Sequence, residues 1–139
     1  MPAIEINLLS IILAVVVSFI FGFVWYTMIF GRIWAVEMGF DPDETPAKAA
    51  MLRGMGLMIL GNFFLAWVFA HNLAVWDAQT WGVGPSEFST MGRATTGALF
   101  TWLGFFVPVQ LSAVAWEKKS WRLFCINSSY HLLDRKSVV

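Results

Sequence analysis

Long apolar runs, separated by charged positions, dominate the pattern of the chain. Three of these runs extend over residues 8–30, 54–76 and 94–116. At a rise of about 1.5 Å per residue, each run is about 34 Å long as a helix and covers a hydrocarbon core of about 30 Å. Strands are excluded because lipid requires every backbone polar group to be satisfied within the segment. The pattern therefore predicts three transmembrane helices.

Signals at the helix ends lengthen two of these helices. Thr45 can cap the second helix and Pro46 suits its first position, while a Gly-Pro turn at 84–85 precedes the third. A shorter apolar segment near the C-terminus adds a truncated fourth helix, too short to cross a bilayer, so we expect an all-α transmembrane bundle. Pro108 removes the hydrogen bond to the Gly104 carbonyl and predicts a kink in the third helix. The expected helices cover residues 8–30, 46–76, 87–116 and 121–133.

The last six residues, 134–139, end the fourth helix with a run of charges. They are the translation of a DNA string that occurs in a widely used sequencing adapter. We interpret this hexapeptide as adapter-derived and not native, which leaves residues 1–133 as a single integral membrane domain. A genuine short basic tail is the alternative.

Composition supports a membrane location. Hydrophobic residues make up 58% of the chain and charged residues 13%, and the net charge is zero. A soluble domain carries about a quarter charged residues, so a soluble enzyme is excluded. The neutral balance gives no electrostatic surface for nucleic acid. The single cysteine excludes a disulfide within the chain and a cysteine-based metal site.

The distribution of lysine and arginine over the loops predicts the orientation of the protein in the membrane. The expected loops at 31–53 and 117–122 hold six basic residues, which are Arg32, Lys48, Arg53, Lys118, Lys119 and Arg122. The loop between the second and third helices holds only Arg93. The positive-inside rule therefore places both basic loops in the cytoplasm and the N-terminus outside. Interfacial tryptophans are then Trp34, Trp116 and Trp121 on the inner side, and Trp76 and Trp81 on the outer side.

Small residues recur at every fourth position on two helices. They are Ser10, Ala14, Ser18 and Gly22 on the first helix, and Ala66, Ala70 and Ala74 on the second. Such ladders let helix backbones approach closely in lipid. We interpret them as packing within the chain, and a homodimer seam is the alternative.

Each predicted helix also supplies one polar side chain to the cytoplasmic half of the membrane. These residues are Tyr26, Asn62, Gln110 and Asn127. Polar side chains at this depth are costly and need a partner. We interpret the layer as a hydrogen-bond network between helices. The functional alternative is a polar pocket, open to the cytoplasm, for a headgroup or small solute.

No catalytic, metal-binding or cofactor-binding residues are predicted. His71 and His131 lie at different depths without carboxylates nearby, which is a poor arrangement for a metal. No nucleophile–base set or pair of carboxylates can be assembled within the spans. We expect His71 to bond a backbone carbonyl or to lie near headgroups, and we expect the protein not to be an enzyme.

Several blocks of sequence resemble one small bacterial family. These are Gly22-Phe23-Val24-Trp25-Tyr26, Phe30-Gly31-Arg32-Ile33-Trp34, Trp102-Leu103-Gly104-Phe105 with Pro108 and Gln110, and Glu117-Lys118-Lys119 with Trp121. Residues 127–130 resemble that family's Asn-Ala-Gly-Tyr with two substitutions. The family is domain of unknown function 1761, in which four transmembrane helices are predicted. The resemblance implies this fold and the bacterial inner membrane, and it implies no activity. In that family the last helix runs on through apolar residues, whereas this chain departs from the pattern at Asp134.

Together these features lead to two functional hypotheses. The first is a non-enzymatic membrane component that forms a homo-oligomer or packs against a membrane partner protein. The alternative is a carrier or binder of a small amphiphilic or polar solute, held by the polar layer. Both hypotheses need the lipid bilayer, and neither involves a cofactor or nucleic acid.

Overall fold

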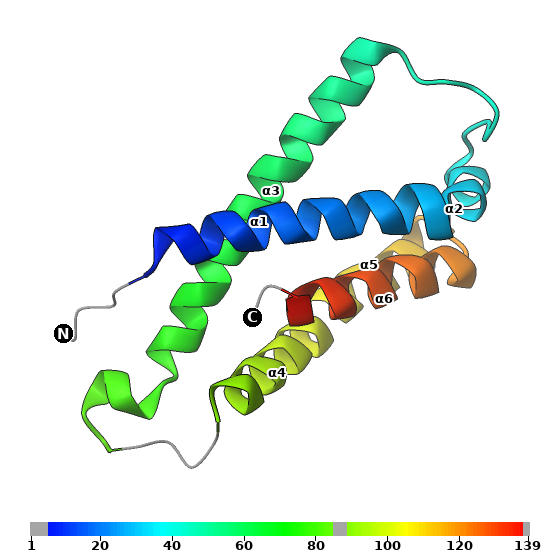
Figure 1. Cartoon of the computed structure of the whole chain (residues 1–139). Coiled ribbons are helices and arrows are strands. Elements are labelled where there is room, and N and C mark those ends of the chain that lie inside the picture. Colours follow the sequence, from blue (N-terminus) through cyan, green and yellow to red (C-terminus); the bar gives the residue numbers. More distant parts are fainter. Residues whose placement is uncertain (1–5, 85–88, 138–139) are drawn as a thin grey trace.

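The computed structural model describes residues 6–84 and 89–137, with side chains placed as far as residue 134. Every secondary-structure element within these ranges is helical (Figure 1). In chain order the elements are α1 (Leu8–Phe23), η1 (Val24–Ile29), α2 (Gly31–Met38), α3 (Lys48–Val75), η2 (Ala78–Trp81), α4 (Thr90–Thr101), η3 (Trp102–Phe106), α5 (Val107–Trp116) and α6 (Trp121–Ser137).

Three continuous helical stretches are long and apolar enough to cross a membrane. Among the described residues they are Leu8–Ile29, Lys48–Val75 and Thr90–Trp116. The last helix, α6, is shorter than any of them. The prediction of an all-α transmembrane bundle with three full spans and a shorter fourth helix is confirmed. The protein is a membrane protein.

Two helix ends differ from the predicted boundaries, and a third predicted boundary cannot be compared. The helix α3 begins at Lys48, and Ala47 takes the N-cap position expected for Thr45. The predicted start of the third span, at 87, lies outside the described residues. The described part begins at Thr90, where the hydroxyl of Ser89 accepts a backbone hydrogen bond as the N-cap. The helix α6 runs past its predicted end at 133.

The segment Gly31–Met38, expected in a loop, forms the short helix α2 directly after the first span. A Cβ atom at Gly31 would lie 2.9 Å from the carbonyl oxygen of Tyr26. The tight turn between η1 and α2 therefore requires a glycine. The helix ends at Gly39, whose φ of 80° is left-handed and favours glycine.

Two segments within the spans, η1 and η3, are wound as π-helix. In η1 the N–H of Phe30 donates to the carbonyl of Trp25, five residues earlier, at 2.9 Å. The segment η3 comes just before Pro108, so the irregularity expected from this proline takes the form of a π-helical turn. Such turns occur often at functional positions in α-helices. Here they coincide with the two tryptophan blocks of the family-like motif.

The first helix connects the two halves of the bundle. It crosses α3 on one side and lies against α6 on another (Figure 1). Two clusters of buried side chains form the core, namely Ile11, Ala14 and Ala66 at the α1–α3 crossing, and Trp25, Ile126 and Tyr130 between η1 and α6. Residues 48–61 of α3 are exposed throughout. This first half of α3 extends away from the other helices in Figure 1.

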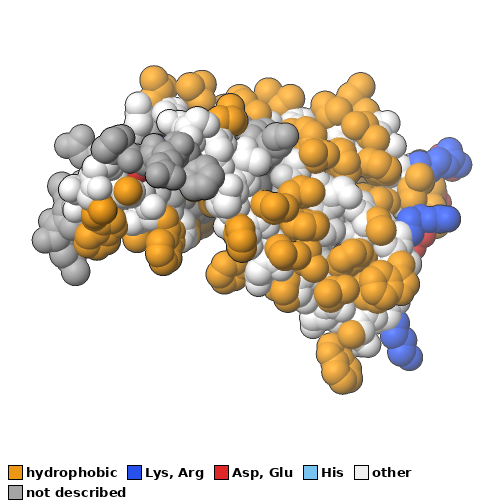
Figure 2. All heavy atoms as spheres, turned by 90° about the horizontal axis from the view of Figure 1, so that it is seen from below, with side chains coloured by type: hydrophobic (Ala, Val, Ile, Leu, Met, Phe, Trp, Pro, Cys, Tyr) orange, Lys and Arg blue, Asp and Glu red, His pale blue; other side chains and the backbone are white. Residues whose placement is uncertain are grey.

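The outer surface is largely apolar. In Figure 2, hydrophobic side chains are spread over much of the described part of the face in view, and Lys and Arg side chains gather at one end. Four exposed tryptophans lie near the helix ends, namely Trp116 and Trp121 at the α5–α6 turn, and Trp76 and Trp81 near the end of α3. We call the end of the bundle that carries Arg32, Lys48, Arg53, Lys118, Lys119 and Arg122 the basic end. An apolar belt between polar ends is the surface expected of a protein in lipid.

Candidate functional site

Two residues of the predicted polar layer are hydrogen-bonded to each other. The hydroxyl of Tyr26 donates to Oδ1 of Asn127 at 3.1 Å. Tyr26 belongs to η1 and Asn127 to α6, so the bond joins the first and last helices. Both side chains are half-buried. A hydrogen bond of this kind stabilises helix contacts in lipid, where water is scarce.

Aromatic rings surround this hydrogen bond. The ring centroid of Tyr26 lies 4.9 Å from that of Tyr130 and 5.6 Å from that of Trp34. Tyr130 stacks on Phe21 at 5.6 Å, with 9° between the ring planes. A Cβ atom at Gly22 would lie 2.9 Å from the hydroxyl oxygen of Tyr130. The absence of a side chain at Gly22 therefore lets α6 approach α1.

Both tryptophans of the family-like blocks bond to the backbone of α6. The indole N–H of Trp25 donates to the carbonyl of Ile126 at 3.2 Å, and that of Trp102 to the carbonyl of Ser128 at 2.8 Å. Asn127 lies between these two acceptors. Because a buried N–H without a partner is costly in lipid, the two bonds hold α6 in place. They also position Asn127 opposite Tyr26.

A cavity of about 510 Å³ lies beside this cluster, between the first half of α3 and the α1–α6 pair. We call it the Tyr26 cavity. Three of the four residues of the predicted polar layer line it, namely Tyr26, Gln110 and Asn127. Four methionines also line it, which are Met38, Met51, Met55 and Met58. The cavity therefore combines a hydrogen-bonding side with a flexible apolar side.

A smaller cavity of about 150 Å³ adjoins the Tyr26 cavity. The two share Met38, Gln110 and Asn127 in their walls. Glu117 and Lys119, from the turn between α5 and α6, also line the smaller cavity. Polar and charged groups therefore continue from the Tyr26 cavity toward the basic end.

The fourth predicted residue, Asn62, lies elsewhere. It is 7% exposed, one helical turn before Ala66, and it does not line the Tyr26 cavity. Ser18 is 2% exposed, one turn beyond Ala14 at the same crossing of α1 and α3. Neither Nδ2 of Asn62 nor Oγ of Ser18 has a hydrogen-bond partner among the described residues. The structure thus brings together three members of the predicted layer and places Asn62 against α1.

The small-residue ladders are divided between two contacts. Ala14 packs against Ala66 in the core of the α1–α3 crossing. Gly22 meets Tyr130 of α6. Ser18 is buried, Ser10 is exposed, and Ala70 and Ala74 are half-buried. Ala14, Gly22 and Ala66 therefore make contacts within the chain.

Not all residues of the family-like motif reach the site. Trp34 lines the Tyr26 cavity. Gly104, Phe105 and Pro108 are exposed along η3 and the start of α5. Their contribution is the π-helical turn, which precedes the proline that cannot donate a hydrogen bond.

The two histidines have different surroundings. Nδ1 of His71 lies 2.8 Å from the carbonyl oxygen of Trp67, which is the expected carbonyl contact. His131 lines the Tyr26 cavity, and its ring lies 4.6 Å from that of Phe106. Within 6–84 and 89–134, no three His, Cys, Asp or Glu side chains are grouped to hold a metal ion.

Sequence reasoning did not include Tyr130, His131 or the methionines in the site. The signal for the first two was present, because Asn127, Tyr130 and His131 are spaced i, i+3 and i+4 and share one face of a helix. Nothing in the sequence indicated that the methionines of α3 face the same space.

The fold and the site define a small multi-pass membrane protein with a cavity between its helices. The chain belongs to the family described as protein of unknown function DUF1761, whose model matches residues 9–135. No curated protein and no solved structure matches the chain.

Proposed function

We propose that the protein binds a small amphiphile in the Tyr26 cavity and acts as a carrier or binding component in the membrane. One observation carries this proposal. Hydrogen-bonding side chains from three helices, Tyr26, Gln110 and Asn127, line one cavity together with four methionines. Ligand sites typically have mostly apolar walls with a few convergent polar groups.

The size and lining of the cavity support an amphiphile over a purely polar solute. A volume of about 510 Å³ lies within the range of small-molecule sites, about 300–1,000 Å³. Methionine adapts its shape to an apolar tail. The adjoining smaller cavity, whose walls include Lys119 and Glu117, provides space for a headgroup near the basic end.

Native mass spectrometry of the protein released from mild detergent tests this proposal. The wild type is expected to carry a bound amphiphile. Met55→Trp places a large ring in the cavity and is expected to lower the fraction of protein that carries an amphiphile in the Tyr26 cavity about tenfold, since a loss of about 1.4 kcal/mol in binding has this effect. Leu52→Trp is the matched control, because Leu52 is exposed on the same helix and does not line the cavity.

Two results would contradict amphiphile binding. One is a wild type without bound amphiphile at every detergent condition that keeps it folded. The other is an equal loss of bound amphiphile in the Met55→Trp and Leu52→Trp variants, which would indicate a ligand held on the outer surface.

A second candidate function is assembly with another copy or a membrane partner. The first half of α3 favours it, because this segment is exposed and a Cβ atom at Gly56, which does not line the Tyr26 cavity, would meet nothing within 4 Å. Glycines on an open helix face allow close approach of another helix in lipid. In the same spectra, a stable dimer or heteromer without bound amphiphile would favour this function over binding.

We also propose that the protein lies in a bacterial inner membrane with its N-terminus outside and its basic end in the cytoplasm. The distribution of Lys and Arg over the loops supports this orientation. After replacement of the exposed Cys125 by serine, a cysteine at Lys118 is expected to be shielded from an impermeant thiol reagent in intact cells. A cysteine at the exposed Gln79 is expected to react. Reversed labelling would overturn the orientation.

A further inference from the structure

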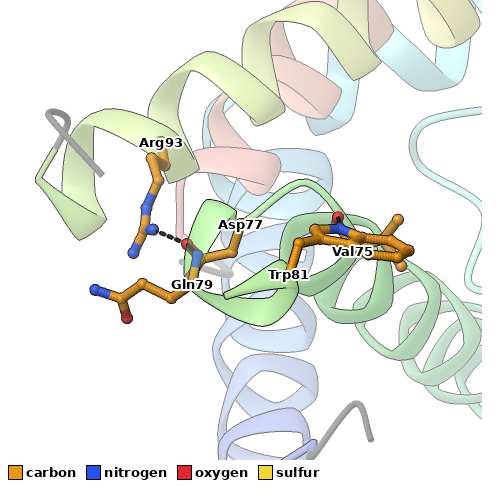
Figure 3. A network of polar contacts seen from close by, with 5 residues as sticks. All are labelled: Val75, Asp77, Gln79, Trp81 and Arg93. Atoms are coloured by element: carbon orange, nitrogen blue, oxygen red, sulfur yellow. Dashed lines mark hydrogen bonds and ion pairs between the residues drawn. The ribbon is translucent and has the colours of Figure 1, made fainter. Parts of the chain in front are cut away.

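An ion pair closes the end of the bundle opposite the basic end. Nη1 of Arg93, in the first turn of α4, donates to Oδ1 of Asp77, which follows α3 (Figure 3). The same oxygen accepts the backbone N–H of Gln79 at 3.1 Å. The indole N–H of Trp81 donates to the carbonyl of Val75 at 2.6 Å and closes the same turn. Asp77 is therefore held firmly in position.

Both members of this pair keep unused hydrogen-bonding capacity. A guanidinium group has five N–H donors, and Asp77 takes one of them. The contacts of Asp77 within the described residues use Oδ1 and leave Oδ2 available. The side chains are 26% exposed for Arg93 and 22% exposed for Asp77, so a ligand can reach them while much of the surrounding water is excluded.

The pair lines a second cavity, of about 340 Å³, between α1, α3 and α4. From Asp77 the cavity extends along α3 as far as Ala66, about 16 Å at the helical rise. Its deeper walls are apolar and include Ile11, Phe69 and Leu73. The cavity thus has charges at the membrane boundary and an apolar interior.

The charges at this boundary cancel, so neither a simple anion nor a simple cation is preferred. A zwitterion satisfies both partners, because its phosphate or carboxylate accepts from Arg93 and its ammonium donates to Oδ2 of Asp77. The ammonium must carry N–H groups, which a trimethylammonium group lacks. We propose that this cavity binds a zwitterionic amphiphile with a primary ammonium head and an acyl tail.

Competition among chain-matched phospholipids in detergent, read by native mass spectrometry, tests the site. Wild type is expected to retain phosphatidylethanolamine about fivefold more than phosphatidylcholine or phosphatidylglycerol, because only its head pairs with both charges. The double variant Asp77→Asn, Arg93→Gln is expected to lose this preference. Equal retention of the three lipids by wild type would overturn the proposal and leave the ion pair as a structural contact only.

A second pair of variants tests the cavity without changing the charges. Ala70 lines the cavity, and Ala70→Phe is expected to lower phosphatidylethanolamine retention about fivefold by filling it. Val68→Phe, on the exposed face of α3, is the matched control and is expected to retain the lipid. Equal retention by both variants would exclude an acyl tail in this cavity.

Two further measurements distinguish an amphiphile in this cavity from a free headgroup and from a lipid bound in the Tyr26 cavity. Water-soluble glycerophosphoethanolamine, at the concentration of the lipid, is expected not to displace it. Full displacement would show that the headgroup alone is the ligand and would contradict the proposal that an amphiphile binds here.

Gln110→Leu, in the Tyr26 cavity, is expected to leave the preference for phosphatidylethanolamine unchanged. A loss of preference in this variant would assign the bound lipid to the Tyr26 cavity and overturn the site at Asp77 and Arg93.

Discussion

Gly22→Ala is expected to lower the free energy of unfolding relative to Gly61→Ala by about 1–3 kcal/mol, the usual cost of overpacking. The new Cβ atom at position 22 would lie 2.9 Å from the hydroxyl oxygen of Tyr130. Tyr130 is 3% exposed and stacked on Phe21, so its ring has little room to move. The contact between α1 and α6 would have to open.

Gly61→Ala provides the matched control for this experiment. Both glycines lie within helices, so the gain in helix propensity of up to about 1 kcal/mol is common to both changes. A Cβ atom at Gly61 would meet nothing within 4 Å. Unfolding in detergent, followed by tryptophan fluorescence, measures both variants. Equal stability of the two variants would show that Tyr130 does not pack against Gly22.

Asn62→Leu is expected to raise the free energy of unfolding by about 1–3 kcal/mol, the cost of leaving a buried polar group unsatisfied. Nδ2 of Asn62 is buried at the α1–α3 crossing and has no hydrogen-bond partner among the described residues. Leucine has a similar size and removes the unsatisfied donor. The variant would also keep the Tyr26 cavity intact, because Asn62 does not line it.

Asn72→Leu on the same helix is the control for Asn62→Leu. Asn72 is exposed, and its amide donates a long bond of 3.5 Å to the carbonyl of Val68. We expect its replacement to change the free energy of unfolding by less than about 0.5 kcal/mol. A loss of stability in Asn62→Leu would show that the amide is satisfied in the membrane and would restore Asn62 to the polar network.

Apolar run length was sufficient to predict the three spans, because a membrane sets the length of a helix that crosses it. The helix α2 could not be recognised in this way. It is short and contains both charged and apolar residues, and its end depends on the left-handed conformation of Gly39. The π-helical turns were also absent from the prediction. Hydropathy reports how apolar a segment is and contains no information on a change from i+4 to i+5 hydrogen bonds.

The polar layer shows what depth can predict and what it cannot. Counting residues from the middle of a span estimates the height of a side chain in the bilayer. The direction in which that side chain points depends on which helix covers each face. The crossing of α1 over α3 turns the face with Asn62 toward α1, whereas Tyr26, Gln110 and Asn127 face one cavity. Height alone could not separate Asn62 from the other three residues.

The bond from Trp25 to Ile126 joins positions 101 residues apart and has a consequence for biosynthesis. Helices α1 and α3 can associate as soon as both have left the ribosome, because Ala14 and Ala66 are then already in the membrane. The indole N–H of Trp25 gains its acceptor only when the last helix inserts. Until then this N–H must find its acceptor in water, in lipid headgroups or in the insertion machinery, since the hydrocarbon core offers none. Integration of the final segment is therefore the step that completes the surroundings of the first helix.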